Sequence, residues 1–338
     1  EITTGDWSSD VCSSDLPDRR VQCRLCPREC LIAPDRCGTC GVRRNEGGRL
    51  QSLSYGRLCA VHVDPIEKKP LFHFMPGSPI LSVGTVGCTL NCRFCQNWEL
   101  ARGDPTRAPD AITPPEVVVA LAMRQHCPCI AFTYNEPTVF AEYVMDVARL
   151  AHHAGLRTVM VTNGYVSPAV IPDLYHEIDA ANVDLKALSE DFYHVQTGGH
   201  LAPVLSTLEA LRANNVWIEV TTLLIPGLND DMGEVRAAAI WIRDHLGCDT
   251  PWHLSAFHPA HRMLDRPPTP LATLEQAQAT ALGQGLRFVY LGNVGRDSNT
   301  LCPHCGRVVI ARTGWSVQHE MANRGARCAC GCAVPVRL

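Results

Sequence analysis

The chain has 18 cysteines in 338 residues, and most of them stand in three groups with short internal spacings. The first 20 residues lack a basic start followed by an apolar core, and no window approaches about 18 consecutive uncharged apolar residues, so neither a secretory signal nor a membrane span is predicted. Cytoplasmic thiols are kept reduced. We therefore expect a cytoplasmic protein whose grouped cysteines bind metal rather than form disulfides.

The first sixteen residues differ in composition from the rest of the chain. Residues 1–16 are rich in Ser and Asp and contain no Lys or Arg. Because residues 6–16 back-translate to a common sequencing-library adapter, we expect 1–16 to be a disordered sequencing artefact, with a short natural tail as the alternative. The four acidic residues of this segment account for the whole formal charge of −4.

Residues 79–296 alternate strand-like and helix-like segments. Short apolar segments rich in β-branched or aromatic residues predict strands at 80–86, 130–133, 157–162, 182–185, 217–223 and 253–257, with 287–291 as a candidate seventh. Amphipathic helices are predicted between them, near 138–154, 203–214, 231–245 and 274–282. Strands that alternate with helices form parallel sheets through right-handed crossovers. We expect an α/β fold, a partial (β/α)6 TIM-like barrel rather than a doubly wound sheet, with its chemistry at the C-terminal strand ends.

Two helix ends carry recognisable signals. Pro114 at the first helical position and Glu116 at the third predict a capping box after Thr113. Gly155 is a natural stop for the helix predicted at 138–154.

Three cysteines follow the first predicted strand in the spacing C-x3-C-x2-C: Cys88, Cys92 and Cys95. Three thiolates this close can hold three irons of a 4Fe–4S cube. No fourth cysteine follows in the loop, so one iron would keep an open position for an exogenous ligand. A zinc ion completed by a distant residue is the alternative, but the aromatic Phe94 and the α/β context favour the cluster.

Two further cysteine groups flank the predicted barrel, in a Cys-rich N-terminal domain (17–78) and a zinc-ribbon-like C-terminal domain (297–338). Four thiolates would occupy every position of each site and leave none open for a further ligand. In the first group, Cys37 is an additional cysteine that is not among the predicted ligands. Zinc and a second iron–sulfur cluster both suit the first group. The C-terminal group brackets a β-rich stretch at 307–317 and predicts zinc, although Cys332 could replace one of its last two ligands. The predicted ligands are Cys23, Cys26, Cys30 and Cys40, and then Cys302, Cys305, Cys328 and Cys330.

The central cysteine loop resembles the defining loop of the radical S-adenosylmethionine (SAM) superfamily. From Cys23 onward the chain is similar to the radical SAM enzymes of the AmmeMemoRadiSam system, which are related to pyruvate formate-lyase activating enzymes. The similar segments are 23–27, 63–74, 92–99, 132–137 and 302–306. The resemblance implies that a 4Fe–4S cluster cleaves SAM reductively to a 5′-deoxyadenosyl radical, which abstracts hydrogen from a protein or protein-bound substrate.

The resemblance also implies a set of cofactor-binding residues. Glu136 stands where the family's Gly-Gly-Glu-Pro motif holds the SAM amino group, although Tyr134 and Asn135 replace the glycines. Segments 162–164 and 184–186 are similar to activase segments that contact the SAM ribose and carboxylate. His253 and His258 are candidate catalytic residues because they lie on the predicted active face. The expected cofactor-binding residues are Phe94, Asn135, Glu136, Thr162, Asn163, Asp184 and Lys186.

The resemblance implies protein partners as well. It suggests AMMECR1-like and Memo-like proteins, and an electron donor such as flavodoxin or ferredoxin. One alternative is an activating enzyme for a glycyl radical enzyme. Another is a non-catalytic zinc scaffold or nucleic-acid-binding protein, but the sequence has no Lys/Arg run to bind nucleic acid.

Overall fold

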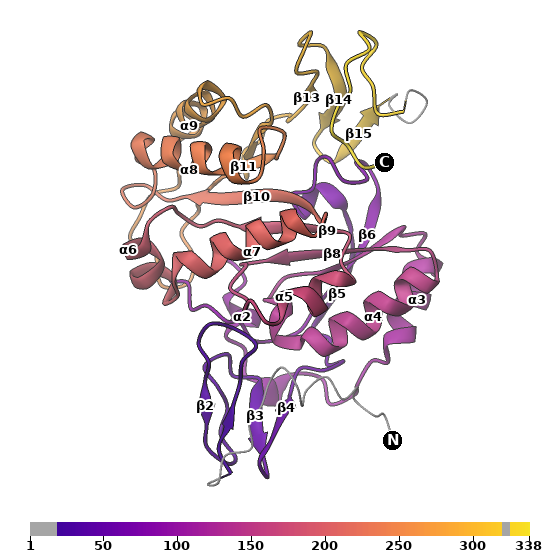
Figure 1. Cartoon of the computed structure of the whole chain (residues 1–338), viewed down its shortest axis with the longest axis vertical. Helices are drawn as coiled ribbons and strands as arrows, with labels where there is room; N and C mark the ends of the chain where they lie inside the picture. The colour runs from indigo at the N-terminus through magenta and orange to yellow at the C-terminus, as the bar shows by residue number, and fades with distance from the viewer. Residues whose placement is uncertain (1–18, 320–324) are drawn as a thin grey trace.

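One eight-stranded sheet runs through the middle of the molecule in the computed structural model, which describes residues 19–319 and 325–338 (Figure 1). The expectation for residues 1–16 lies outside this range. The strands lie side by side in chain order; from β6 to β12 each neighbouring pair is parallel, and β5 is antiparallel to β6. They are β5 (Ala60–Pro65), β6 (Pro79–Gly84), β7 (Cys129–Phe132), β8 (Arg157–Thr162), β9 (Ala180–Asp184), β10 (Trp217–Leu224), β11 (Trp252–Ala256) and β12 (Val289–Gly292).

The strand order differs from that of a doubly wound sheet. A doubly wound sheet reverses its strand order near the middle, whereas each crossover here advances to the next position. The six predicted strands are confirmed within a few residues at their ends, and the candidate seventh is β12. The inner strands are buried on both faces; every residue of β7 is buried, as expected for a parallel sheet covered by helices.

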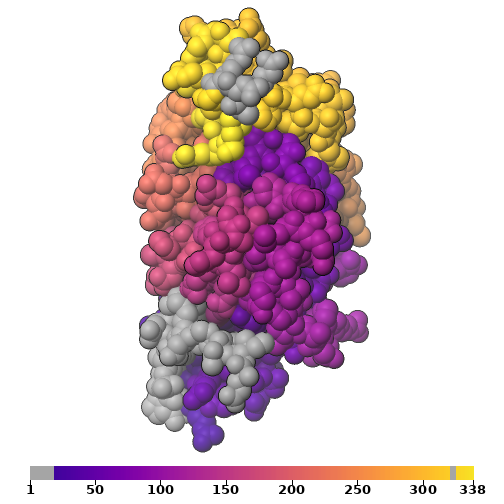
Figure 2. Space-filling view, turned by 90° about the vertical axis from the view of Figure 1, so that its right-hand side faces the viewer, coloured from indigo at the N-terminus to yellow at the C-terminus, as the bar shows by residue number. Residues whose placement is uncertain are grey.

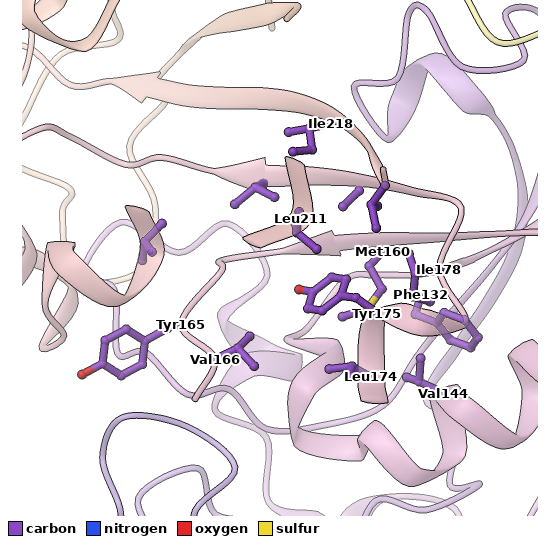
Figure 3. Close-up of a cluster of buried hydrophobic side chains, with 14 of the residues drawn as sticks. Phe132, Val144, Met160, Tyr165, Val166, Leu174, Tyr175, Ile178, Leu211 and Ile218 are labelled. Carbon is purple, nitrogen blue, oxygen red and sulfur yellow. The ribbon is translucent and has the colours of Figure 1, made fainter. Parts of the chain in front are cut away.

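Helices connect the parallel strands and pack against the sheet. Figure 1 shows α3, α4, α5 and α7 along one side of it. Between α4, α5 and the strands, apolar side chains such as Val144, Met160 and Leu174 meet in the main core (Figure 3). The helices are α2 (Trp98–Ala101), α3 (Pro115–Arg124), α4 (Ala141–His153), α5 (Ile171–His176), α6 (Glu190–Phe192), α7 (Leu201–Ala213), α8 (Met232–His245) and α9 (Leu271–Gly283), with short 3-10 turns at Ile66–Lys68, Pro105–Arg107 and Pro137–Phe140 and a π-helical turn at Tyr193–Thr197.

Of the two helix-end signals in the sequence, one is confirmed and one is wrong. Helix α4 ends at His153, and Gly155 takes the left-handed φ of +76° that closes it, as predicted. The predicted capping box before α3 is wrong, because the helix begins one residue later: Pro114 is the N-cap and has no side-chain oxygen to accept a hydrogen bond. No helix in the described part of the chain combines the length and apolar character that crossing a membrane requires.

The early and the late parts of the described chain lie at opposite ends of the molecule (Figure 2), and each contains small antiparallel sheets. At the N-terminal end, β1 (Val21–Gln22) pairs with β2 (Leu31–Ile32), and β3 (Arg43–Glu46) with β4 (Arg49–Ser52). The buried Arg43 joins this region to α4 through an ion pair with Glu142. At the other end, β13 (Thr300–Leu301), β14 (Val308–Thr313) and β15 (Ser316–His319) form the sheet predicted as a β-rich stretch.

The chain between β5 and β6 crosses from the main sheet to the C-terminal region. The Phe72 and His73 amide N–H groups donate to the buried Glu219 carboxylate on β10, at 2.9 and 2.7 Å. Arg312 of β14 donates to the Phe72 carbonyl. Residues 60–78 therefore pack with the sheet and the C-terminal region, although the sequence grouped them with the N-terminal cysteines.

Candidate functional site

A cavity of about 290 Å³ lies at the C-terminal ends of the parallel strands. Its walls come from the loops that follow successive strands, so residues far apart in the chain meet there. Every residue predicted to bind the cofactor, and all three central cysteines, line it: Cys88, Cys92, Phe94, Cys95, Asn135, Glu136, Thr162, Asn163, Asp184 and Lys186.

The cysteine loop that leaves β6 is held from both sides. Gly87 has a φ of +100°, and a Cβ there would meet Val42 at 2.7 Å, so only glycine fits this turn. The Asn91 amide donates to the Thr197 carbonyl at 2.8 Å. Phe94 is buried against Phe192, with ring centroids 5.9 Å apart. The loop is therefore fixed in place by packing and backbone bonds.

The three cysteines of this loop are protonated thiols, not free thiolates, in the absence of a metal. They are half-buried, and no fourth cysteine within the described ranges lines the cavity. Burial raises the pKa of the Cys92 thiol to about 11 and that of Cys88 further. Without a metal such thiols stay protonated at neutral pH, whereas a bound metal would displace their protons.

A lysine ammonium lies beside the cysteines. Lys186 donates to Asp184 Oδ2 at 2.9 Å and lies 5.8 Å from the centroid of the Phe94 ring. Burial lowers its pKa, but Asp184 and Cys92 outweigh burial and raise the pKa above its usual value, so this group stays charged. Asn229 braces the backbone next to it by donating to the Lys186 carbonyl at 2.7 Å.

Glu136 joins the ends of β7 and β8. Its Oε1 accepts from the Thr138 amide and from the hydroxyls of Thr138 and Thr162, at 2.7 to 3.1 Å. Among the described residues, its Oε2 accepts one hydrogen bond, from the Asn163 backbone N–H at 2.8 Å. Burial raises the pKa of this carboxyl. Because Oε2 accepts a single hydrogen bond, it can accept a further one from a cationic ligand group.

Asn135 lines the cavity, but its side chain is used to brace the cysteine loop. Its Nδ2 donates to the Thr85 hydroxyl and the Gly87 carbonyl, both at 3.0 Å, and its Oδ1 accepts from the Thr85 amide at 2.9 Å. The sequence predicted a cofactor contact; the observed bonds make Asn135 a positioning residue for the loop.

Replacing Asn135 by alanine is expected to destabilise the protein by about 2 kcal/mol, because buried backbone groups at Thr85 and Gly87 lose their partners. Asn214→Ala is a matched control, since that exposed side chain makes one bond to the Ala210 carbonyl. Urea unfolding of the two variants measures the difference. Equal midpoints would contradict the bracing role.

The far wall of the cavity was not predicted. It is built from residues on or near the ends of β10, β11 and β12 and from the crossing chain before β6. Ser255 and Asn293 could have been identified as lining residues, because both are polar residues at the ends of predicted strands. No pattern near Pro70 in the sequence indicates that it reaches the cavity. The unpredicted lining residues include Pro70, Thr221, Leu223, Ser255 and Asn293.

Neither candidate catalytic histidine lines the cavity. His253 is buried, and its Nε2 lies 2.7 Å from Glu219 Oε2. Ser255, two residues further along β11, faces the same side and reaches the cavity, so His253 lies one layer deeper. His258 is exposed. The geometry therefore assigns His253 to an internal hydrogen-bond network and gives His258 no place in the cavity.

The two flanking cysteine groups differ in their spacing. Among the residues that the structure describes, one set of three or more potential ligands has all its ligand atoms within 4.8 Å of one another: Cys302, Cys305, Cys328 and Cys330. Cys332 is outside this set. Cys23, Cys26, Cys30 and Cys40 line one small cavity, which Cys37 does not.

A larger cavity, of about 680 Å³, opens at the other end of the sheet, where β8, β9 and β10 begin. None of the predicted site residues lines it. Parallel α/β folds place their chemistry at the C-terminal strand ends, which favours the smaller cavity as the functional site.

Comparison with known proteins gives a consistent relationship. The model of the radical SAM superfamily matches residues 82–238. An uncharacterised protein of Methanocaldococcus jannaschii is 41% identical over 299 residues, which are 88% of this chain and 89% of that protein. The pyruvate formate-lyase 1-activating enzyme of Escherichia coli (strain K12) is 26% identical over 164 residues, 47% of this chain and 66% of that enzyme. The benzylsuccinate synthase activating enzyme of Thauera aromatica is 24% identical over 241 residues, 67% of this chain and 71% of that enzyme.

Proposed function

The chain belongs to the radical SAM superfamily, and from this premise we propose that it is an enzyme that cleaves S-adenosylmethionine reductively and abstracts hydrogen from a protein or protein-bound substrate. The observation that carries the proposal is the convergence of three cysteines, with no fourth in the described part of the chain, on a cavity lined by a carboxylate and an ammonium. We also propose that the sheet is curved as a partial (β/α)6 barrel and that the enzyme works in the cytoplasm.

The residues of the cavity fit the two groups that this activity needs. Three thiols on one loop match three irons of a 4Fe–4S cluster and leave one iron open. A volume near 300 Å³ is the lower end of the range for small-molecule sites. When bound there, the cluster would supply the electron that cleaves the SAM sulfonium to methionine and a 5′-deoxyadenosyl radical, which takes hydrogen from the substrate.

The chain's own residues would hold and orient SAM. Glu136 Oε2 is suited to the SAM ammonium, because it is a buried carboxylate oxygen with one bond already made. Lys186 is suited to the SAM carboxylate, and its charge beside Cys92 also favours a negatively charged cluster. The Thr162 hydroxyl and the Asn163 amide keep Glu136 oriented.

Two relatives named as activating enzymes favour a protein substrate. A glycyl-radical-enzyme activase is therefore the second candidate, in which the hydrogen comes from a backbone glycine of a partner. AMMECR1-like and Memo-like proteins remain proposed partners on the basis of family resemblance, and a flavodoxin or ferredoxin is the proposed electron donor. A glycyl radical signal in the electron paramagnetic resonance (EPR) spectrum of a partner would select the activase.

At the C-terminal end we propose a structural zinc. The Sγ atoms of Cys302 and Cys330 are 3.6 Å apart, and those of Cys305 and Cys328 are 3.7 Å apart. Zinc–sulfur bonds of about 2.3 Å in a tetrahedron set a sulfur–sulfur distance of about 3.8 Å. The four cysteines are therefore already at the spacing that one zinc ion requires.

Anaerobic reconstitution with iron and sulfide, followed by dithionite and SAM, tests the proposed function. The protein is expected to be brown and to release 5′-deoxyadenosine and methionine in equal amounts, measured by chromatography. The control omits dithionite, and we expect no product there. A colourless protein that leaves SAM intact would instead support a zinc scaffold.

A further inference from the structure

The N-terminal cysteines surround a small cavity of their own. Cys23 and Cys26 are buried, Cys30 and Cys40 are half-buried, and all four line it. The backbone between β1 and β2 folds back on itself, because the Cys23 amide donates to the Cys30 carbonyl at 2.9 Å. The exposed Cys37 lies in the same region but outside the cavity. The four residues therefore form a closed set of thiol ligands.

The spacing of these four thiols differs from that of the C-terminal set. No three of their Sγ atoms lie within 4.8 Å of one another, since the C-terminal cysteines alone meet that criterion among the described residues. A single zinc ion draws its thiolates to about 3.8 Å. A four-iron cube lies between its thiolates, one at each iron, and holds them farther apart. The N-terminal spacing therefore fits an iron–sulfur cluster better than zinc.

The walls of this cavity suit a negatively charged group. Leu25, Ile32 and Val139 supply apolar contacts, and two arginines, Arg28 and Arg43, supply positive charge. Arg43 is neutralised by its ion pair with Glu142. Arg28 donates instead to two backbone carbonyls, at Thr89 and Gly198, both at 2.5 Å. A cluster with four thiolate ligands is anionic, so the Arg28 charge would stabilise it.

The N-terminal cavity shares a residue with the central cysteine loop. Thr89 lines the N-terminal cavity, and the residue before it, Cys88, lines the central one. Asn163 donates to both, to Thr89 Oγ1 at 3.1 Å and to Cys88 Sγ at 3.5 Å. The linings of the two cavities are therefore adjacent in the chain at Cys88 and Thr89, and the Asn163 side chain is hydrogen-bonded to both residues.

We propose that Cys23, Cys26, Cys30 and Cys40 bind a second 4Fe–4S cluster, which relays single electrons to the cluster at Cys88, Cys92 and Cys95. The relay rests on the proposed function; the metal assignment does not. One electron passes from a reduced flavodoxin- or ferredoxin-class protein to the N-terminal cluster and then to the central one. The donor is oxidised by one electron, and no bond forms or breaks in the relay itself.

Metal analysis of the anaerobically reconstituted full chain tests the assignment. We expect about eight iron atoms and one zinc ion in the unaltered protein, and about four iron atoms in the triple variant Cys88→Ala/Cys92→Ala/Cys95→Ala. The triple variant leaves the N-terminal cysteines intact, so the result does not depend on whether altered N-terminal sites fold. Reduced triple variant should give the EPR signal of one isolated cluster. About two zinc ions and no iron in that variant would overturn the proposal.

The relay is tested with Cys26→Ala and with Cys37→Ala as its matched control, since Cys37 lies outside the cavity. Rapid-mixing reduction of the central cluster by flavodoxin hydroquinone is expected to slow more than tenfold in Cys26→Ala and to stay unchanged in Cys37→Ala. Reduction by the small reductant dithionite should still occur in both. Equal flavodoxin rates in the two variants would overturn the relay. If the triple variant retains iron but the unaltered protein leaves SAM intact, the proposed function is overturned, whereas the assignment of the N-terminal cluster stands.

Discussion

Cys92→Ala is expected to form 5′-deoxyadenosine more than about 10³-fold more slowly than the unaltered protein, because the reaction depends on an intact cofactor. Enzymes accelerate reactions by at least about 10⁶-fold, so a decrease of this size is expected when the cofactor is lost. Cys92 lines the cavity together with Lys186. With two thiols left on the loop, a cluster that needs three cannot be held in its working form. The measurement is product formed per chain after anaerobic reconstitution, with dithionite and SAM in excess.

The matched control is Cys248→Ala, at a half-buried cysteine that lines neither the central cavity nor the N-terminal one. This variant should keep the activity of the unaltered protein and its iron content. Undiminished product in Cys92→Ala would end the radical SAM interpretation of this loop. Equal loss in both variants would indicate a general effect of removing cysteines and would also contradict the assignment.

The second large effect is expected in stability. Glu219→Ala should lower the free energy of unfolding by about 4 kcal/mol, because it removes a fully buried carboxylate from several donors at once. These donors are the amides of Phe72 and His73, the His253 ring and the Trp217 indole, the last at 3.2 Å from Oε1. The crossing chain would lose the two backbone hydrogen bonds that it donates to Glu219 on β10.

Glu209→Ala is the control for this substitution, because Glu209 is exposed and pairs with His245 at the surface. Its loss should cost less than about 1 kcal/mol. Urea unfolding followed by circular dichroism compares the two variants under identical metal loading. Midpoints within error of each other would show that the buried network contributes little.

The site was predictable to the extent that it lies on strand ends. Asp184 lies near the end of a predicted strand and Glu136 follows another, and parallel strands bring their C-terminal ends to one edge. The spacing of Cys88, Cys92 and Cys95 could be recognised without a structure, because it is local in the sequence. The strand pattern did not show which polar side chains bond to the cysteine loop: Asn135 donates to the Gly87 carbonyl, whereas Glu136 accepts from the Asn163 backbone N–H.

The unpredicted parts depend on contacts between distant residues. Strand β5 exposes Val61 and Val63 at the sheet edge, so it lacks the buried pattern by which the other strands were found. Pro70 reaches the cavity because its carbonyl accepts from Asn182, 112 residues away, at 2.8 Å. His253 was assigned to the active face from its strand alone, and its depth depends on Glu219 of the neighbouring strand. No local pattern encodes such pairings.

The polar groups around the cavity are already bonded to one another before any ligand arrives. Glu136 accepts four hydrogen bonds, and Asn135 makes three with the cysteine loop. Most of the conformational entropy cost of arranging the site is therefore incurred during folding, so the site is preorganised for a ligand. Cofactor affinity in this protein should consequently depend more on how rigidly these hydrogen bonds hold the site than on the number of groups that touch the cofactor.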